Sequence, residues 1–314
     1  MTTERYPVIC GPTAGGKTAL AFAVADELCA RGRGAEIVSA DAYLVYRGLD
    51  IGTAKPTREE LEKIPHHLVD IIEPTQAFAV AQWLALAERA IAEIQARGSV
   101  PIVVGGTHLF MKALIDGLFE GPEPDPELRA RLQALGAEEL RGRLEAVDPD
   151  SAARIHPADT RRTIRALEVY EQTGQTITSL QTQWDREHPR DPGVQLVVLS
   201  WETATINSRI NARVKQMRQM GLTAEVRGLH EAGRLGPTAG QALGYKQLVD
   251  HFEGRCSEDD AYERIKIETR RFAKNQRTWL RRLQTTPGTL TLRPEEQDPV
   301  QMAQIIVNKV LTDA

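Results

Sequence analysis

The sequence contains one motif that constrains the fold strongly, the octapeptide GPTAGGKT at residues 11–18, which matches G-x-x-x-x-G-K-[ST]. It follows a short apolar segment, Tyr6–Cys10, and precedes a helix-length segment, Lys17–Ala30. Between a strand and a helix, the glycines let the backbone curl so that its N–H groups point at phosphate oxygens, and the helix adds its positive end. The sequence therefore predicts a phosphate-binding loop in an α/β domain.

Every residue of this loop is a candidate phosphate contact. Lys17 supplies a positive charge, and the hydroxyl of Thr18 is placed to coordinate Mg²⁺. The predicted phosphate-binding residues are Gly11, Pro12, Thr13, Ala14, Gly15, Gly16, Lys17 and Thr18.

Short apolar runs alternate with helix-length segments through the first 120 residues, which is typical of a parallel sheet with crossover helices. Three prolines in GPEPDP, residues 121–126, break this pattern, and a strand returns at Val194–Ser200. We predict an α/β core like that of P-loop NTPases, residues 1–120 and 191–314, interrupted by an all-helical insertion at 121–190. Besides Tyr6–Cys10, the predicted early strands are Glu36–Ser39 and Val100–Val104; the predicted helices after Lys17–Ala30 are Val80–Arg97, Glu127–Ala146, Ala158–Thr173, Asn207–Met220, Thr223–Ala232, Ala242–Phe252 and Glu258–Leu283.

Composition excludes several classes of protein. The 314 residues contain no run of about 18 apolar residues, so we expect no membrane partner, and the polar start does not resemble a signal peptide. The three cysteines are far apart and form no C-x-x-C pair, which favours reduced thiols and a cytoplasmic location over a disulfide framework or a zinc site. The net charge of −4 argues against a uniformly basic nucleic-acid binder.

The acid that a nucleotide hydrolase needs to complete its Mg²⁺ site is missing after the strand Val100–Val104, which continues into Gly105, Gly106 and Thr107. Asp41 instead follows the strand Glu36–Ser39, at the sheet edge where ligands bind in open α/β sheets. There it could cap a turn or accept a proton from a substrate. These residues alone leave three candidates: a small-molecule kinase, an NTPase, and a transferase whose substrate carries a diphosphate.

Eight segments, in order, resemble the isopentenyl-tRNA transferase (tRNA dimethylallyltransferase) family. They are GPTAGGKT, SADAYLVYRGLDIGTAKP, PHHLVDI, PIVVGGTHLFMKAL, RIHPADTRRTIRALEVYEQTG, GLTAEVRGL, ALGYKQL and TRRFAKNQRTWLRR, and they span most of the chain. The adenylate isopentenyltransferases share the first half of this set, whereas the later motifs look more like the tRNA enzymes.

The resemblance implies transfer of a dimethylallyl group from dimethylallyl diphosphate to N6 of adenosine 37, beside the anticodon of tRNA, with Mg²⁺. The loop would then hold a leaving group rather than a nucleotide to be hydrolysed. Asp41 matches the family's catalytic base, Thr107 the threonine that holds the adenine amine, and Arg227 an arginine that reaches the diphosphate; Lys17 would stabilise the departing charge. Residue 42 is Ala where the family usually has Ser.

Two basic helices are the candidate contacts for the anticodon stem-loop. Spacings of three and four residues place four cations, from Arg270 to Arg281, on one helix face, and three more begin the helix predicted at 158–173. Taken alone, such faces fit RNA phosphates or ordinary solvated surfaces with ion pairs equally well. The predicted tRNA contacts are Asp41, Ala42, Tyr43, Leu44, Thr107, Arg129, Arg161, Arg162, Arg165, Lys274, Arg277 and Arg281.

Phe272 and Trp279, on the late basic helix, are predicted to lie in the core, and a monomer is expected. Three hypotheses remain: a tRNA prenyltransferase, which the motifs favour; an adenylate prenyltransferase or P-loop kinase; and an inactive RNA-binding relative, which the Ala42 replacement motivates.

Overall fold

The computed structural model describes residues 5–119, 121–181 and 193–312. The chain divides into two compact units. Unit 1 combines Met1–Ile115 with Asp191–Ala314, and unit 2 is Asp116–Arg190. Unit 2 thus begins five residues before the predicted insertion at 121.

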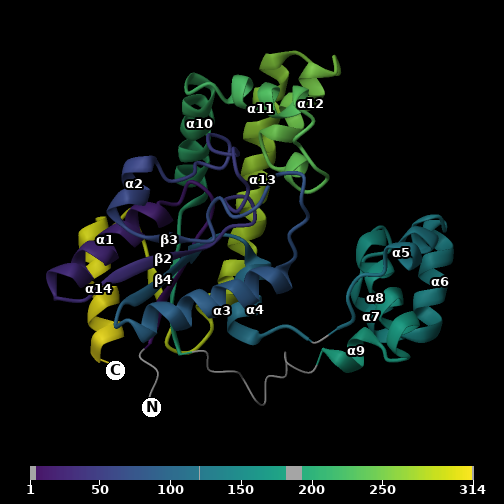
Figure 1. The fold of residues 1–314 in the computed structure, drawn as a ribbon, viewed down its shortest axis with the longest axis horizontal. Coiled ribbons are helices and arrows are strands. Elements are labelled where there is room, and N and C mark those ends of the chain that lie inside the picture. Colours follow the sequence, from purple (N-terminus) through teal and green to yellow (C-terminus); the bar gives the residue numbers. More distant parts are fainter. Residues whose placement is uncertain (1–4, 120, 182–192, 313–314) are drawn as a thin grey trace. The chain divides into compact units, whose positions relative to one another are not determined.

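Unit 1 is built on one six-stranded sheet with the order β3-β2-β4-β1-β5-β6, in which all neighbours run parallel (Figure 1). The central strand β1 is flanked by β4 and β5, and all its residues are buried, as expected for a strand covered by helices on both faces. The strands are β1 (Tyr6–Cys10), β2 (Ala35–Ala40), β3 (His66–His67), β4 (Val100–Gly105), β5 (Val194–Leu199) and β6 (Leu290–Leu292).

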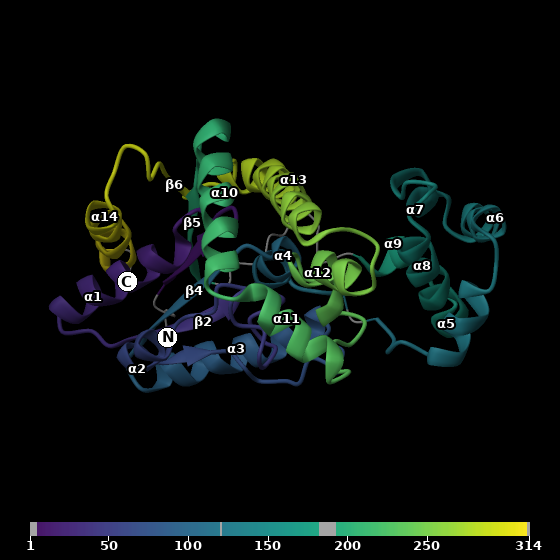
Figure 2. The same ribbon diagram turned by 90° about the horizontal axis from the view of Figure 1, so that it is seen from above.

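Helices cover both faces of this sheet. In Figure 2, α1 and α14 lie together on one side, and α3, α4 and the C-terminal part of α13 lie on the other. Trp83 and Leu280 enter the same buried core as the strands. The helices are α1 (Lys17–Ala30), α2 (Arg58–Lys63), α3 (Val80–Ala96), α4 (His108–Asp116), α13 (Glu258–Gln284) and α14 (Pro299–Thr312).

A second core of unit 1 lies beyond the sheet, where α10, α11, α12 and the first half of α13 pack together (Figure 1). Residues from the long loop after β2, including Val45, Tyr46 and Leu49, are buried in this core. This packing fixes the loop that carries Asp41 against helices from the distant end of the chain. The bounds are α10 (Thr203–Gln219), α11 (Leu222–Glu231), a short 3₁₀ turn (Ala239–Gln241) and α12 (Tyr245–Phe252).

Unit 2 consists of helices around a core of its own, to which Leu128, Leu144 and Leu167 contribute. The predicted continuous helix Glu127–Ala146 is wrong, because the structure has two helices there: the first ends at Gln133, and Gly136 caps the second. The helices are α5 (Pro126–Gln133), α6 (Ala137–Val147), α7 (Pro149–Arg154), α8 (Thr160–Thr173) and α9 (Ile177–Leu180).

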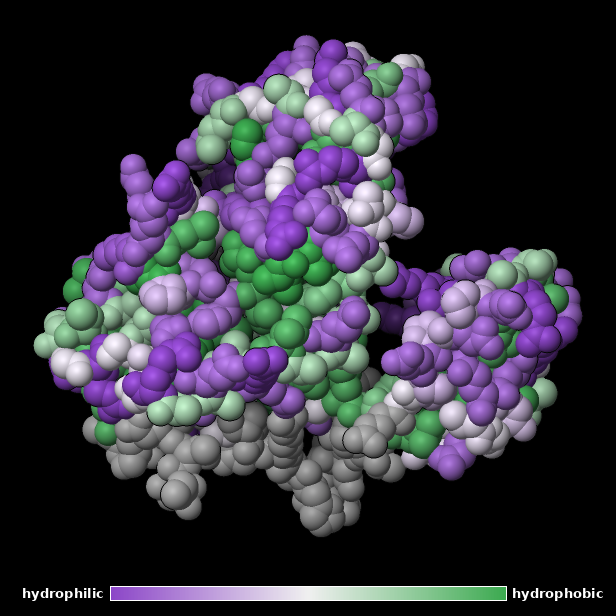
Figure 3. All heavy atoms as spheres, viewed as in Figure 1, coloured by the Kyte–Doolittle hydropathy of each residue, from purple (hydrophilic) through white to green (hydrophobic). Residues whose placement is uncertain are grey.

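The α/β class and the parallel sheet are confirmed. In Figure 3, the visible face of unit 1 is largely hydrophilic around a hydrophobic area at its centre. Within the described residues, no helix has both the length and the apolar character that crossing a membrane requires.

Candidate active site

The phosphate loop connects β1 to α1, and its backbone is shaped to expose N–H groups. Gly16, the N-cap of α1, has φ 79°, which a glycine adopts without the steric cost of a Cβ. Gly15 donates its N–H to the carbonyl of Pro12 at 3.1 Å, closing the turn. The first N–H groups of a helix have no intrahelical partner, so the start of α1 offers donors and a partial positive charge to an anion.

Lys17 is held inside the loop, where its Nζ donates to the carbonyl of Pro12 at 2.9 Å. Burial lowers the pKa of Lys17 to about 8, with Asp41 opposing the shift and Arg213 adding to it. Without a bound anion, the ammonium of Lys17 therefore loses its proton as the pH rises through about 8.

Asp41 and Thr107 follow the neighbouring strands β2 and β4, and Thr107 is bonded to the backbone next to Asp41. The carboxylate of Asp41 accepts the N–H of Tyr43 at 2.9 Å, and the hydroxyl of Thr107 accepts the N–H of Ala42 at 3.0 Å. Because the link at residue 42 uses the backbone, the replacement of the usual Ser by Ala leaves it intact.

One cavity of about 100 Å³ joins the loop to Asp41. Its polar wall includes Thr13, Lys17, Thr18 and Asp41, and its apolar wall includes Leu44. Asp41 therefore lies on the same cavity as the loop, as predicted. Ala14, Gly15 and Gly16 line an adjoining, more open cavity that shares Lys17 and Thr18.

Arg213, on α10, is a site residue that the sequence analysis missed. It lines both cavities and donates to the carbonyl of Thr53 at 3.2 Å. Its charge contributes to the lowered pKa of Lys17, and the carboxylate of Asp41 opposes the fall that burial causes in the pKa of Arg213 itself. No local pattern marks it, since it belongs to an ordinary amphipathic helix.

Arg227, predicted to reach the diphosphate, does not come to the loop. Its guanidinium lies over the ring of Phe252, 4.9 Å from the centroid, and it lines neither cavity. The reason is helix geometry: Glu225, two residues earlier on α11, faces the loop after β2, and residues two apart on a helix point in nearly opposite directions. Two arginines of α10 lie at the loop instead: Arg209 donates to the carbonyl of Ala14 at 2.9 Å, and Arg213 lines both cavities.

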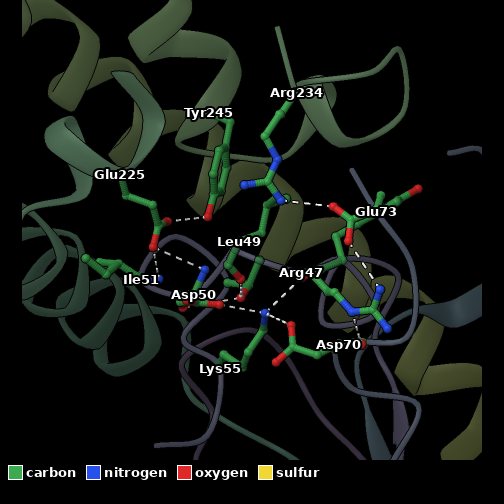
Figure 4. Close-up of polar contacts among 12 residues, drawn as sticks. Arg47, Leu49, Asp50, Ile51, Lys55, Asp70, Glu73, Glu225, Arg234 and Tyr245 are labelled. Atoms are coloured by element: carbon green, nitrogen blue, oxygen red, sulfur yellow. Dashed lines mark hydrogen bonds and ion pairs between the residues drawn. The ribbon is translucent and has the colours of Figure 1, made fainter. Parts of the chain in front are cut away.

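Glu225, on α11, holds residues 50–52 of the long loop after β2 in place (Figure 4). Its carboxylate accepts the N–H groups of Asp50, Ile51 and Gly52 at 3.2, 2.8 and 3.3 Å, and the hydroxyl of Tyr245 at 2.5 Å. Burial, together with the adjacent carboxylate of Glu225, raises the pKa of Tyr245, so this phenol stays protonated and keeps donating.

Lys55 stabilises the same loop: it donates to the carbonyl of Tyr46 at 2.8 Å and to the carboxylates of Asp50 and Asp70 (Figure 4). Its side chain is 4% exposed, so the ammonium is buried and paired. Thr53 and Pro56, on either side of Lys55, line the cavity, so these contacts shape the wall opposite the phosphate loop.

The basic face of α13 is partly engaged within unit 1. Arg270 donates to Asn211 and Arg277 to Thr203, at 2.8 and 2.7 Å, whereas Lys274 and Arg281 are exposed. The prediction that Phe272 is a core residue is wrong, because its side chain is 40% exposed and lines the cavity. Trp279 is partly buried against the sheet core, as predicted.

The cations predicted in unit 2 have different environments. Arg129 makes two 2.6 Å hydrogen bonds to Glu168, which is completely buried, and Arg165 lies 3.6 Å from the same carboxylate. Arg162 pairs with Asp159 at 3.4 Å but remains 72% exposed, and Arg161 is also exposed. Asp159 is the N-cap of α8, so its negative charge partly offsets the cations there.

The residues around the loop fit a magnesium ion that arrives with a diphosphate. Among the described residues, no group of three or more His, Cys, Asp or Glu side chains could hold a metal. Mg²⁺ characteristically takes one or two protein ligands and completes its shell with phosphate oxygens and water. The hydroxyl of Thr18, on the cavity wall with Asp41, suits that arrangement.

Comparison with known proteins places this architecture in a family. The model of the family described as IPP transferase matches residues 44–283, and that described as isopentenyl transferase matches residues 5–73. The chain belongs to the IPP transferase family. A tRNA dimethylallyltransferase of Geobacillus thermodenitrificans is 46% identical over 286 residues, which cover 89% of this chain and 88% of that one.

Solved structures agree with the family assignment. The full-length tRNA isopentenylpyrophosphate transferase of Bacillus halodurans superposes with a TM-score of 0.70 at 34% identity, covering 98% of this chain and 97% of that one. A eukaryotic dimethylallyltransferase crystallised while acting on tRNA gives a TM-score of 0.84 at 24% identity, covering 99% of this chain and 80% of that one. At 24% identity the second likeness bears on the fold alone.

Proposed function

We propose that this member of the IPP transferase family transfers a dimethylallyl group from dimethylallyl diphosphate to N6 of adenosine 37 in tRNA. The observation that carries the proposal is the single cavity in which Asp41 faces the phosphate loop, Lys17 and Arg213. A cationic end for a diphosphate and a carboxylate for the acceptor are what prenyl transfer to an amine requires. The 46% identity to a tRNA dimethylallyltransferase supports the choice of donor and acceptor.

In the proposed reaction, the N6 nitrogen forms a bond to C1 of the dimethylallyl group while the C1–oxygen bond breaks and its electron pair leaves with the diphosphate. Asp41 accepts the proton that N6 loses. Lys17, Arg213 and the N–H groups at the start of α1 stabilise the charge on the departing diphosphate. Thr107, whose hydroxyl already accepts the N–H of Ala42, keeps a proton and a lone pair with which to hold the amine beside Asp41.

Thr18 would hold Mg²⁺ together with diphosphate oxygens. The ion would supply charge neutralisation at the leaving group. The protein's part is to present the Thr18 hydroxyl at the first turn of α1, beside the ammonium of Lys17.

For the tRNA, each unit contributes a cationic helix. In unit 1, α13 offers Lys274, Arg277 and Arg281, and in unit 2, α8 offers Arg161, Arg162 and Arg165. Exposed Phe272, at the cavity wall on α13, has an aromatic face on which an unstacked base can lie. Arg129 is the weakest of the predicted contacts, since two charge-assisted hydrogen bonds already bind its guanidinium to Glu168.

The test is transfer of labelled dimethylallyl from its diphosphate to three acceptors: an unmodified tRNA with adenosine 37, AMP and ATP. We expect label on the tRNA alone, at N6 of adenosine 37, with one diphosphate released for each group transferred. Preferential labelling of AMP or ATP would make the chain an adenylate prenyltransferase. Binding of tRNA without any transfer would identify an inactive RNA-binding relative.

A further inference from the structure

Helix α13 has a largely charged, exposed sequence, yet one of its polar residues is turned into the protein. Gln276 is 6% exposed, and its amide is bonded at both ends. Its Oε1 accepts the N–H of Thr13, in the phosphate loop, at 2.8 Å, and its Nε2 donates to the carbonyl of Gly106, after β4, at 2.8 Å. The two partners fix the orientation of the amide, because one is a donor and the other an acceptor.

The absence of a side chain at Gly106 makes room for this amide. A Cβ at that position would lie 2.5 Å from Nε2 of Gln276 and 3.4 Å from Nζ of Lys17. The first of these separations is too short for any real contact with a Cβ. The amide of Gln276 and the ammonium of Lys17 therefore flank the same small space at the end of β4.

We propose that Gln276 is a positioning residue for the phosphate loop, a role that deepens the proposed function and rests on it. By joining Thr13 to Gly106, its amide fixes the first half of the loop relative to the sheet. The N–H groups at the start of α1, and Lys17, are then aimed at one place, where the diphosphate binds. The amide oxygen is committed to the loop, so Gln276 acts through Thr13 rather than by direct contact with the reacting atoms.

Loss of the amide would leave the N–H of Thr13 and the carbonyl of Gly106 without partners in a partly buried site. Groups in that state seek water or another polar partner, and the loop would shift to provide one. The loss of the amide should therefore weaken diphosphate binding, at the end of the cavity that the phosphate loop lines. RNA contacts made by the exposed side chains of α13 would remain.

The experiment measures the affinity of the full chain for inorganic diphosphate with Mg²⁺, by calorimetry, so that the readout does not depend on prenyl transfer. Gln276→Leu removes both hydrogen bonds, and we expect diphosphate to bind about tenfold more weakly or worse. Asn275→Ala, which removes an exposed amide from the adjacent position of α13, is the matched control and should change the affinity by less than about twofold. Affinity for tRNA should stay within about threefold for both variants.

Gln276→Glu separates positioning from general damage. The ionised carboxylate can accept the N–H of Thr13 but cannot donate to Gly106, and it places a negative charge where the diphosphate binds. The protonated carboxyl accepts and donates as the amide does. We therefore expect the ratio of the variant's dissociation constant to that of the parent to fall as the pH is lowered from 8 to 5.5. Dividing by the parent's dissociation constant at each pH cancels the titration of diphosphate itself.

Diphosphate binding by Gln276→Leu at parental strength would overturn the positioning role. If that variant fails to fold, Gln276→Glu still decides, because a ratio that does not change with pH would also overturn it. A parent chain that binds diphosphate but transfers no dimethylallyl group would remove the proposed function and leave the role of Gln276 measurable. A parent chain that binds no diphosphate would remove both.

Discussion

Raising the pH above about 8 should weaken diphosphate binding, because Lys17 then loses its positive charge. In the free protein, burial lowers the pKa of Lys17 to about 8, so the ammonium is charged at pH 7. An anion favours the charged form and raises this pKa in the complex. Affinity is therefore greatest below pH 8 and falls above it, where binding must first return a proton to Lys17.

The expected size follows from that pKa. At pH 9 about one Lys17 in ten is charged, so the dissociation constant for diphosphate should be about tenfold larger than at pH 7, and about a hundredfold larger at pH 10. At pH 8.5 Lys17 should account for the uptake of most of one proton per diphosphate bound. Among the groups that shift the pKa of Lys17, Cys10 has its own pKa raised by burial to about 12, and the guanidinium of Arg213 remains charged. Neither accounts for a transition near pH 8.

The assay is calorimetry with inorganic diphosphate from pH 6.5 to 10, in pairs of buffers with different ionisation enthalpies, which gives affinity and proton uptake together. Lys17→Arg is the control, because a guanidinium does not titrate in this range, so the pH dependence of its weaker binding is that of diphosphate itself. The ratio of the parent's dissociation constant to that of Lys17→Arg then isolates the titration of Lys17. A parent chain that binds equally well at pH 7 and pH 9.5 without taking up a proton would refute the argument.

Three further predictions concern other parts of the site. Asp41→Asn should keep diphosphate affinity and lower the turnover of prenyl transfer by about 10²–10⁴, the usual range for a general base; near-normal turnover would remove Asp41 from that role. Arg213→Gln should weaken diphosphate binding by about tenfold or more, since it removes a charge at the cavity, while Arg227→Gln should change it by less than about twofold; the opposite order would restore Arg227 as the diphosphate ligand. Neutralising either basic trio, Lys274 with Arg277 and Arg281 or Arg161 with Arg162 and Arg165, should weaken tRNA binding and lower its salt dependence by about one unit of slope for each lost phosphate contact, and unchanged slopes for both would make these helices ordinary solvated faces.

The parts of the site that the sequence predicted are those built by local geometry. The loop between β1 and α1 needs its glycines and Lys17 within eight residues, and α1 has the predicted bounds. Asp41 could be placed at the cavity because strand ends in a parallel sheet share one edge. The resemblance supplied the family and the acceptor, which local geometry does not contain.

The residues that the sequence did not predict come from distant segments. Gln276 is 263 positions from Thr13, and nothing in its neighbourhood marks it as the inward-facing member of a basic helix. Arg213 likewise depends on how α10 lies over the loop. Arg227 shows the converse error: its motif was identified, but which side of α11 faces the site depends on packing against α12 and the loop after β2.

The charges on the cavity wall also explain how this loop can serve a transferase. At the end of β4, where a nucleotide hydrolase would carry its acid, the carbonyl of Gly106 is bonded to the neutral amide of Gln276. Among the described residues that line the cavity shared by Lys17, Arg213 and Asp41, Asp41 is the one acid, and Glu60 lines the adjoining cavity. The proposed diphosphate would bring more negative charge than Lys17 and Arg213 offset, which suits an anion that binds with its own Mg²⁺. With the hydroxyl of Thr18 rather than a carboxylate as the proposed ligand of that ion, Asp41 would stay free to take the proton from the acceptor.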